Sequence, residues 1–175
     1  MAGIFAMKTT LAIDTATART QFAILKGDEL IWQQIEDGAT THGDVLAKFG
    51  VLASRENIDQ VIVGMGPGPF TGLRVGIVFG QSFAYARGIP WRGVCSLDAM
   101  AAQIHDADFI VATDARRKEY FWAHYKAGKR VGDPQVALTK VVDSLHTTIH
   151  KEGDLFPSAA HLVASPENYR EPLYI

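Results

Sequence analysis

Features that mark several large classes of protein are missing from this sequence of 175 residues. It contains a single cysteine, Cys95, so it cannot form an internal disulfide, and this favours a reducing compartment. Its apolar runs are shorter than the ~18 residues needed to span a membrane, and residues 1–7 lack the charged start of a signal peptide. We therefore expect a cytoplasmic protein without a membrane segment.

An excess of charge of either sign is also missing. The chain has 17 Lys and Arg against 19 Asp and Glu, which gives a net charge of −2. Proteins that bind nucleic acid on their own usually carry a clear basic surface, so we expect any contact with RNA to depend on a partner. The 47% of hydrophobic residues and 21% of charged residues are typical of a globular protein.

Candidates for catalytic chemistry are few. Ser82 lies in a near match to a nucleophile elbow, Gly80-x-Ser82-x-Ala84, but it falls inside a predicted helix and not at a strand-to-helix turn. His146 and His150 have the i, i+4 spacing of two metal ligands on a helix, without a third histidine at a useful spacing. We interpret them as a solvated helix face. We expect no catalytic residue, no metal and no cofactor.

Glycine is concentrated in one stretch, with eight of the 16 glycines between Gly64 and Gly93. The stretch follows the apolar run 61–63 and opens onto a predicted helix, an order that usually suggests a phosphate-binding loop. Pro67 and Pro69 remove two N–H donors, however, and the glycine spacing fits neither common nucleotide fingerprint. We therefore interpret it as a rigid, shaped loop. The residues of this motif loop are Gly66, Pro67, Gly68, Phe70, Thr71 and Arg74.

Small residues recur along the helix that follows the motif loop. Gly72, Gly76, Gly80 and Ala84 are four residues apart, so they form one stripe on a helix face. Each glycine inside a helix costs about 0.5–1 kcal/mol relative to alanine, so the stripe must allow another part of a protein to come close. Packing on the chain's own sheet and pairing with a partner helix both satisfy this requirement. The spacing alone does not separate them.

The order of predicted elements indicates an α/β protein with two lobes. Predicted strands cover residues 9–13, 21–25, 30–35, 58–63 and 91–95, and predicted helices cover 43–54, 71–87 and 96–104. After residue 106 the opening pattern of strand, Asp-containing turn and strand begins again, with strands at 109–113, 119–125 and 130–131. We predict a first lobe over residues 1–106, with a mixed sheet, and a smaller second lobe over 107–175.

Asp14 and Asp114 each lie in the first hairpin of their lobe. In actin, sugar kinases and Hsp70, two such aspartates face a magnesium nucleotide across the cleft between the lobes. Aspartates in hairpins also commonly satisfy their own turns, and we favour this interpretation because the glycines after residue 113 make no paired-glycine turn for adenosine. The nucleotide interpretation stays open. It would make Asp14, Thr15 and Asp114 a vestigial nucleotide site.

These residues together resemble the TsaB family, also called YeaZ. The resemblance rests on Gly64-x-Gly66-Pro-Gly68-x-Phe70-Thr71-Gly72-x-Arg74-x-Gly76, Ala12-Ile13-Asp14-Thr15, Gly88-Ile89-Pro90, Gly93-Val94-x-Ser96-Leu97, Asp114-Ala115-Arg116-Arg117 and Pro172-Leu173-Tyr174. It is dense from about residue 11 to 103 and sparse after residue 125. Two departures stand out: Pro69 replaces the usual serine, and the second lobe is shorter than is typical.

The resemblance implies a two-lobed actin-like ATPase fold (ASKHA, ribonuclease H-like) with a shortened second lobe. It also implies a non-catalytic accessory subunit of the complex that forms N6-threonylcarbamoyladenosine at position 37 of tRNA. The implied partners are a TsaD-like catalytic subunit, which it would activate, and a TsaE-like ATPase, with tRNA reached only through the complex and a homodimer formed when alone. The alternatives are a small actin-like ATPase or kinase and, from the family's glycoprotease label, a metallopeptidase.

Family members pair through the helices of the first lobe, here residues 43–54 and 71–87. The resemblance therefore implies a partner interface on these two helices. Its predicted members are Val45, Phe49, Leu52, Gly72, Val75, Gly76, Phe79, Gly80 and Phe83.

Overall fold

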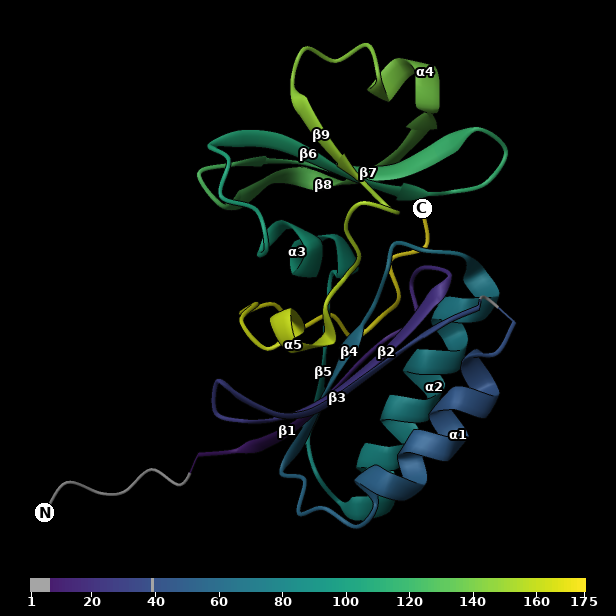
Figure 1. Ribbon diagram of the computed structural model, residues 1–175, viewed down its shortest axis with the longest axis vertical. Helices are drawn as coiled ribbons and strands as arrows, with labels where there is room; N and C mark the ends of the chain where they lie inside the picture. Colours follow the sequence, from purple (N-terminus) through teal and green to yellow (C-terminus); the bar gives the residue numbers. More distant parts are fainter. Residues whose placement is uncertain (1–6, 39) are drawn as a thin grey trace, which may run out of the picture.

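The computed structural model describes residues 7–38 and 40–175, which form two β-sheets arranged along the long axis of the molecule (Figure 1). The strands of the first sheet are β1 (Thr9–Asp14), β2 (Arg19–Lys26), β3 (Glu29–Asp37), β4 (Gln60–Gly64) and β5 (Trp91–Val94). Those of the second are β6 (Asp108–Asp114), β7 (Glu119–Lys126), β8 (Lys129–Leu138) and β9 (Thr148–Lys151). The helices are α1 (His42–Ala53), α2 (Phe70–Arg87), α3 (Ser96–Ala101), α4 (Thr139–Val142) and α5 (Ala159–Leu162).

The first sheet is mixed, with strand order β3-β2-β1-β4-β5. β1, β2 and β3 form an antiparallel meander, while β4 and β5 run parallel to β1. Alternate side chains of β1 point to opposite faces of the sheet, and both sets are buried. Leu11 and Ile13 pack under α1 and α2, whereas Ala12 packs against α5 on the other face. The first sheet is therefore the centre of a three-layer arrangement.

α1 and α2 cover one face of the first sheet, side by side (Figure 1). α2 turns its buried residues toward β4 and β1, and its end is set by Gly88, whose φ of 63° gives the left-handed C-cap that glycine adopts without strain. The sequence predicted this stop from Gly88 and Pro90. Among the described residues, no helix is both long and apolar enough to cross a membrane.

The second sheet has the order β8-β7-β6-β9 and packs on α3. Leu97 and Met100 of α3 meet Phe109 and Tyr125, whose rings stack with centroids 5.3 Å apart. β8 is longer than the two residues expected from the sequence. α3 thus lies between the two sheets, as Figure 1 shows.

The last part of the described chain returns to the first sheet. α5 packs against β1, β2 and β4 on the face opposite α1 and α2 (Figure 1). The backbone N–H of Tyr169 donates to the carbonyl oxygen of Gly93 at 2.9 Å, and that of Leu173 donates to Met65 at 2.8 Å. The strands of the two sheets fall on either side of residue 106, and the segment after β9 contacts both lobes. The division at residue 106 stays a prediction.

The prediction that His146 and His150 share a helix face is wrong. His150 lies in strand β9, and His146 lies in the irregular segment before it. The β-branched residues Thr147, Thr148 and Ile149 favour an extended chain here, and β9 pairs with β6. His150 Nε2 lies 2.8 Å from Asp106 Oδ2, so its ring has a carboxylate partner.

Candidate functional site

Asp14 ends β1 with its carboxylate inside the protein, where only 1% of the residue is exposed. Ser96, at the start of α3, donates its hydroxyl to Asp14 Oδ2 at 2.6 Å, and the backbone N–H of Ala16 donates to Oδ1 at 2.9 Å. Burial is the main reason that the pKa of Asp14 is raised to about 6. The carboxylate therefore stabilises its own turn and α3, and both its oxygens are engaged.

The motif loop closes directly over this turn. A side chain at Gly64 would overlap the Asp14 carboxylate, and one at Gly68 would overlap the carbonyl of Ala16. The Thr15 hydroxyl donates to the carbonyl of Gly72 at 2.8 Å. The glycines of this region thus let the chain fill the space beside the β1–β2 turn with its own backbone.

Asp114 has a different environment, at the exposed end of β6. Its Oδ1 accepts from the backbone N–H of Arg116 at 2.8 Å, and the guanidinium of the same arginine lies 3.3 Å from Oδ2. Glu152 accepts from the N–H groups of Asp114, at 2.9 Å, and Ala18, at 3.4 Å, so it joins the two hairpins. Asp114 lines a cleft of about 370 Å³ that Asp14 does not line. The vestigial nucleotide site stays a prediction.

The glycine stripe of α2 faces the chain's own first lobe. A side chain at Gly76 would overlap Thr15, and one at Gly80 would overlap Val63 of β4. At Gly72 it would lie 3.1 Å from His42 Nε2. These contacts correct the placement of the three glycines on a partner-facing surface. They let α2 approach the sheet, and the spacing could not distinguish this from pairing with another chain.

Other predicted interface residues lie at the seam between α1 and α2. Phe49 is buried in the core beneath the two helices. Val45, Val75, Phe79 and Phe83 are half-buried and pack against the same core. Gly50 gives room for the Phe79 ring, because a side chain there would come within 2.7 Å of it.

An outer apolar face remains on the two helices. We define it by the exposed side chains Val51, Leu52, Phe70, Val78 and Tyr85. Tyr85 is 90% exposed, and Phe70 and Val78 are 57% and 56% exposed. Leu52 belonged to the predicted interface and Phe70 to the motif loop. Val51, Val78 and Tyr85 were not predicted from the sequence, although 70, 78 and 85 fall on one side of a helix of 3.6 residues per turn.

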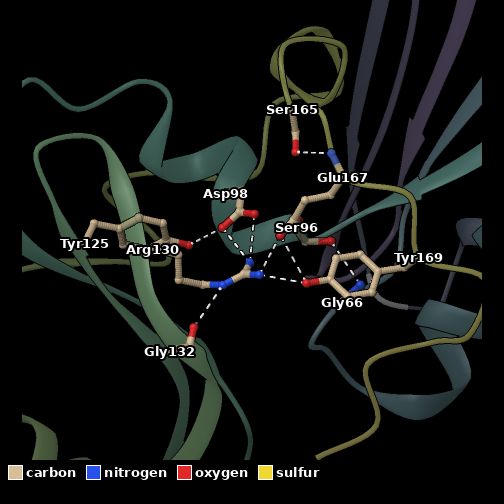
Figure 2. A network of polar contacts seen from close by, with 9 residues as sticks. All are labelled: Gly66, Ser96, Asp98, Tyr125, Arg130, Gly132, Ser165, Glu167 and Tyr169. Atoms are coloured by element: carbon tan, nitrogen blue, oxygen red, sulfur yellow. Dashed lines mark hydrogen bonds and ion pairs between the residues drawn. The ribbon is translucent and has the colours of Figure 1, made fainter.

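A polar network links the second sheet to α3 and to the C-terminal segment (Figure 2). Arg130 of β8 donates to both carboxylate oxygens of Asp98, at 2.8 and 2.7 Å. It also donates to Glu167 Oε1 at 2.6 Å and to the Tyr169 hydroxyl at 2.7 Å. Tyr125 donates its hydroxyl to Asp98 at 2.7 Å. Burial, followed by the adjacent Glu167, raises the pKa of Asp98 to about 6.

Two β-sheets of this order, with α1 and α2 on one face of the first, define a two-lobed α/β protein of the actin-like class, as predicted. YeaZ from Pseudomonas aeruginosa superposes with a TM-score of 0.75 at 23% identity, covering 90% of each chain. The family model for TsaD, tRNA N6-adenosine threonylcarbamoyltransferase, matches residues 43–162.

Relatives in sequence agree with this structural likeness. An uncharacterised protein of Mycobacterium tuberculosis is 41% identical over 145 residues, which cover 78% of this chain and 68% of that protein. The tRNA threonylcarbamoyladenosine biosynthesis protein TsaB of Escherichia coli is 31% identical over 134 residues, which cover 66% of this chain and 54% of TsaB. The present chain thus spans about half the length of that TsaB. It belongs to the TsaB (YeaZ) family, which is named for tRNA threonylcarbamoyladenosine biosynthesis.

Proposed function

We propose that this chain is a non-catalytic accessory subunit that docks on a TsaD-like catalytic subunit through the outer apolar face of α1 and α2. The observation that carries the proposal is that face itself, where Phe70, Val78 and Tyr85 are more than half exposed. Large apolar side chains exposed on one side of a helix are costly in water, and they commonly mark a surface that a partner covers.

The relationship between the two families supports a TsaD-like partner. The chain matches the family model of TsaD, so the two proteins share this part of their fold. Two related subunits can pair through equivalent helices in the way that two copies pair across a two-fold axis. The same face would then form a homodimer when the chain is alone. In the complete complex, a TsaE-like ATPase and tRNA are reached through the TsaD-like subunit.

The ATPase or kinase alternative fits the geometry less well. It needs Asp14 and Asp114 to face one ligand, whereas Asp14 is buried with both oxygens hydrogen-bonded and Asp114 is exposed. Among the described residues, no group of three or more metal-ligating side chains comes together. Docking through α1 and α2 requires neither of these features.

The test is a pair of valine substitutions with similar exposure. Val78→Asp places a charge in the outer apolar face, and Val131→Asp places one on β8, where the valine is 51% exposed. We expect Val78→Asp to weaken binding to a purified TsaD-like subunit by at least roughly a hundredfold, because a charge at the centre of an interface loses its water. Isothermal titration calorimetry measures the affinity. Analytical ultracentrifugation reports the homodimer.

Val131→Asp is expected to bind like the unchanged protein, and both variants should keep its circular dichroism spectrum and melting temperature. If Val78→Asp pairs normally and Val131→Asp does not, the docking surface lies on the second lobe and the assignment to α1 and α2 is wrong.

A further inference from the structure

A pocket of about 430 Å³ opens where the N-terminal ends of α1 and α2 meet the first turn of the second sheet. Figure 1 shows both helices running away from the second sheet, with their N-terminal ends nearest to it. None of the described residues that line the pocket is acidic. The residues that matter for its chemistry are Thr17, His42, Gly43, Thr71, Gly72 and Arg116.

Both helices begin at this pocket without a side-chain cap. The amides of Gly43 and Gly72 belong to the first turns of α1 and α2, and neither has a hydrogen-bond partner among the described residues. Pro69 precedes α2 and supplies no capping oxygen from its side chain. Free N–H groups at a helix N-terminus carry partial positive charge, and here two such ends converge.

His42 provides an independent sign of a ligand. It is 97% buried, its Nδ1 lies 2.6 Å from the Thr20 hydroxyl, and no described residue contacts its Nε2 through a hydrogen bond. The Thr20 hydroxyl engages Nδ1, so Nε2 is the ring nitrogen left to face a ligand, and it donates in the tautomer that carries its proton there. That edge of the ring lies against Gly72, which lines the pocket. The histidine therefore presents a ring nitrogen without a partner among the described residues.

Arg116 brings a full positive charge to the pocket from the second lobe. It begins a run of three basic residues, Arg116, Arg117 and Lys118, whose φ angles of 66°, 51° and 64° are left-handed. The turn is held in this conformation by hydrogen bonds, including one from the N–H of Glu119 to the Arg116 carbonyl at 2.9 Å. Asp114 pairs with the Arg116 guanidinium at 3.3 Å and competes with any ligand for it.

We propose that this pocket binds a phosphate group, held by the first-turn amides of both helices, by His42 through Nε2 and by Arg116. Donors from two helix ends, with an arginine opposite them, match the oxygens of a phosphate. The amide donors lie in the first turns of α1, at Gly43, and of α2, at Gly72, whereas Pro67 and Pro69 supply no N–H group. The phosphate belongs to a small phosphomonoester or to the backbone of an RNA.

Three probes distinguish these sources in solution. Sodium phosphate, AMP and the pentanucleotide UpUpUpUpU, which has only phosphodiesters, are titrated into ¹⁵N-labelled protein and followed by NMR. We expect the amides of Gly43 and Gly72 to shift, while that of Gly128 in the β7–β8 turn stays in place. Shifts with phosphate and AMP identify a monoester site, and shifts with the pentanucleotide alone identify RNA. No shift of either helix glycine with any probe would overturn the proposal.

Two neighbouring arginines give a matched pair of variants. Arg116 lines the pocket and Arg117 does not, although both have left-handed backbones. Arg116→Ala is expected to weaken binding roughly tenfold, as for loss of one charged hydrogen bond, and Arg117→Ala by less than about twofold. Equal losses would indicate general attraction to positive charge and would also refute the site. The docking proposal is independent of this result, because pairing is measured without phosphate.

Discussion

Gly76 offers a direct test of where the stripe of small residues on α2 packs. Its α-carbon faces Thr15, and a methyl group added there would overlap the Thr15 hydroxyl and lie 3.1 Å from Thr15 Cγ2. Thr15 is 1% exposed and donates its hydroxyl to Gly72, so its side chain cannot turn away without losing that bond. We therefore predict that Gly76→Ala destabilises the protein.

The magnitude follows from three effects. Overpacking of this kind costs about 1–3 kcal/mol, and the lost or distorted Thr15 hydrogen bond costs about 1 kcal/mol more. The better helix propensity of alanine returns about 1 kcal/mol. The net loss is about 2 kcal/mol, which lowers the melting temperature of a chain of this size by roughly 4–8 °C. Urea unfolding followed by circular dichroism measures the change in free energy.

Gly43→Ala is the matched control, because Gly43 is also helical and a methyl group there would meet nothing within 4 Å. It should be neutral or stabilising by up to about 1 kcal/mol. In a Thr15→Ala background, Gly76→Ala should cost much less, since the overlapping atoms are gone. If Gly76→Ala is as stable as Gly43→Ala but loses its partner, the stripe faces another chain and the packing described above is wrong.

Two further predictions concern buried charge. Because the pKa of Asp14 is raised from 3.8 to about 6, its protonation favours the folded state below pH 6 and this contribution is lost as the pH rises through 6. The free energy of unfolding should gain about 1.3 kcal/mol from Asp14 between pH 7 and pH 5, and Asp14→Asn should lack that gain; equal pH profiles would contradict the burial of the carboxylate. Arg130→Ala leaves Asp98 and Glu167 without their shared cation and should cost about 3 kcal/mol in urea unfolding. Lys126→Ala, which breaks an exposed pair, should cost under about 0.5 kcal/mol, and similar losses in both variants would refute the importance of the network.

Much of the fold could be predicted because it is encoded locally. The alternating and continuous apolar runs located β1, β4 and β6 to within a residue or two, and Gly88 marked the end of α2. The prediction of a helix at His146 and His150 was wrong because an i, i+4 spacing is present in any chain, whatever its conformation. The spacing of the two histidines took no account of the β-branched residues between them, which favour the strand β9.

The parts that could not be predicted depend on contacts between distant residues. The spacing of Gly72, Gly76 and Gly80 identified a close approach, but the residue that approaches Gly76, Thr15, lies about sixty positions earlier. Arg130 meets Asp98 and Glu167 across gaps of 32 and 37 residues, and no local pattern connects them. Their order in space is set only when α3 and the C-terminal segment fold back between the sheets.

The way Arg130 is held has a mechanical consequence. The Arg130 guanidinium joins strand β8 of the second sheet to α3 and to the C-terminal segment (Figure 2). That segment is itself paired with the first lobe through the isolated bridge between Gly93 and Tyr169. Moving the two sheets apart would separate Arg130 from the half-buried carboxylates of Asp98 and Glu167, at a cost of several kcal/mol. The two sheets are therefore held in one relative arrangement, and the docking partner proposed above would always meet the same surface.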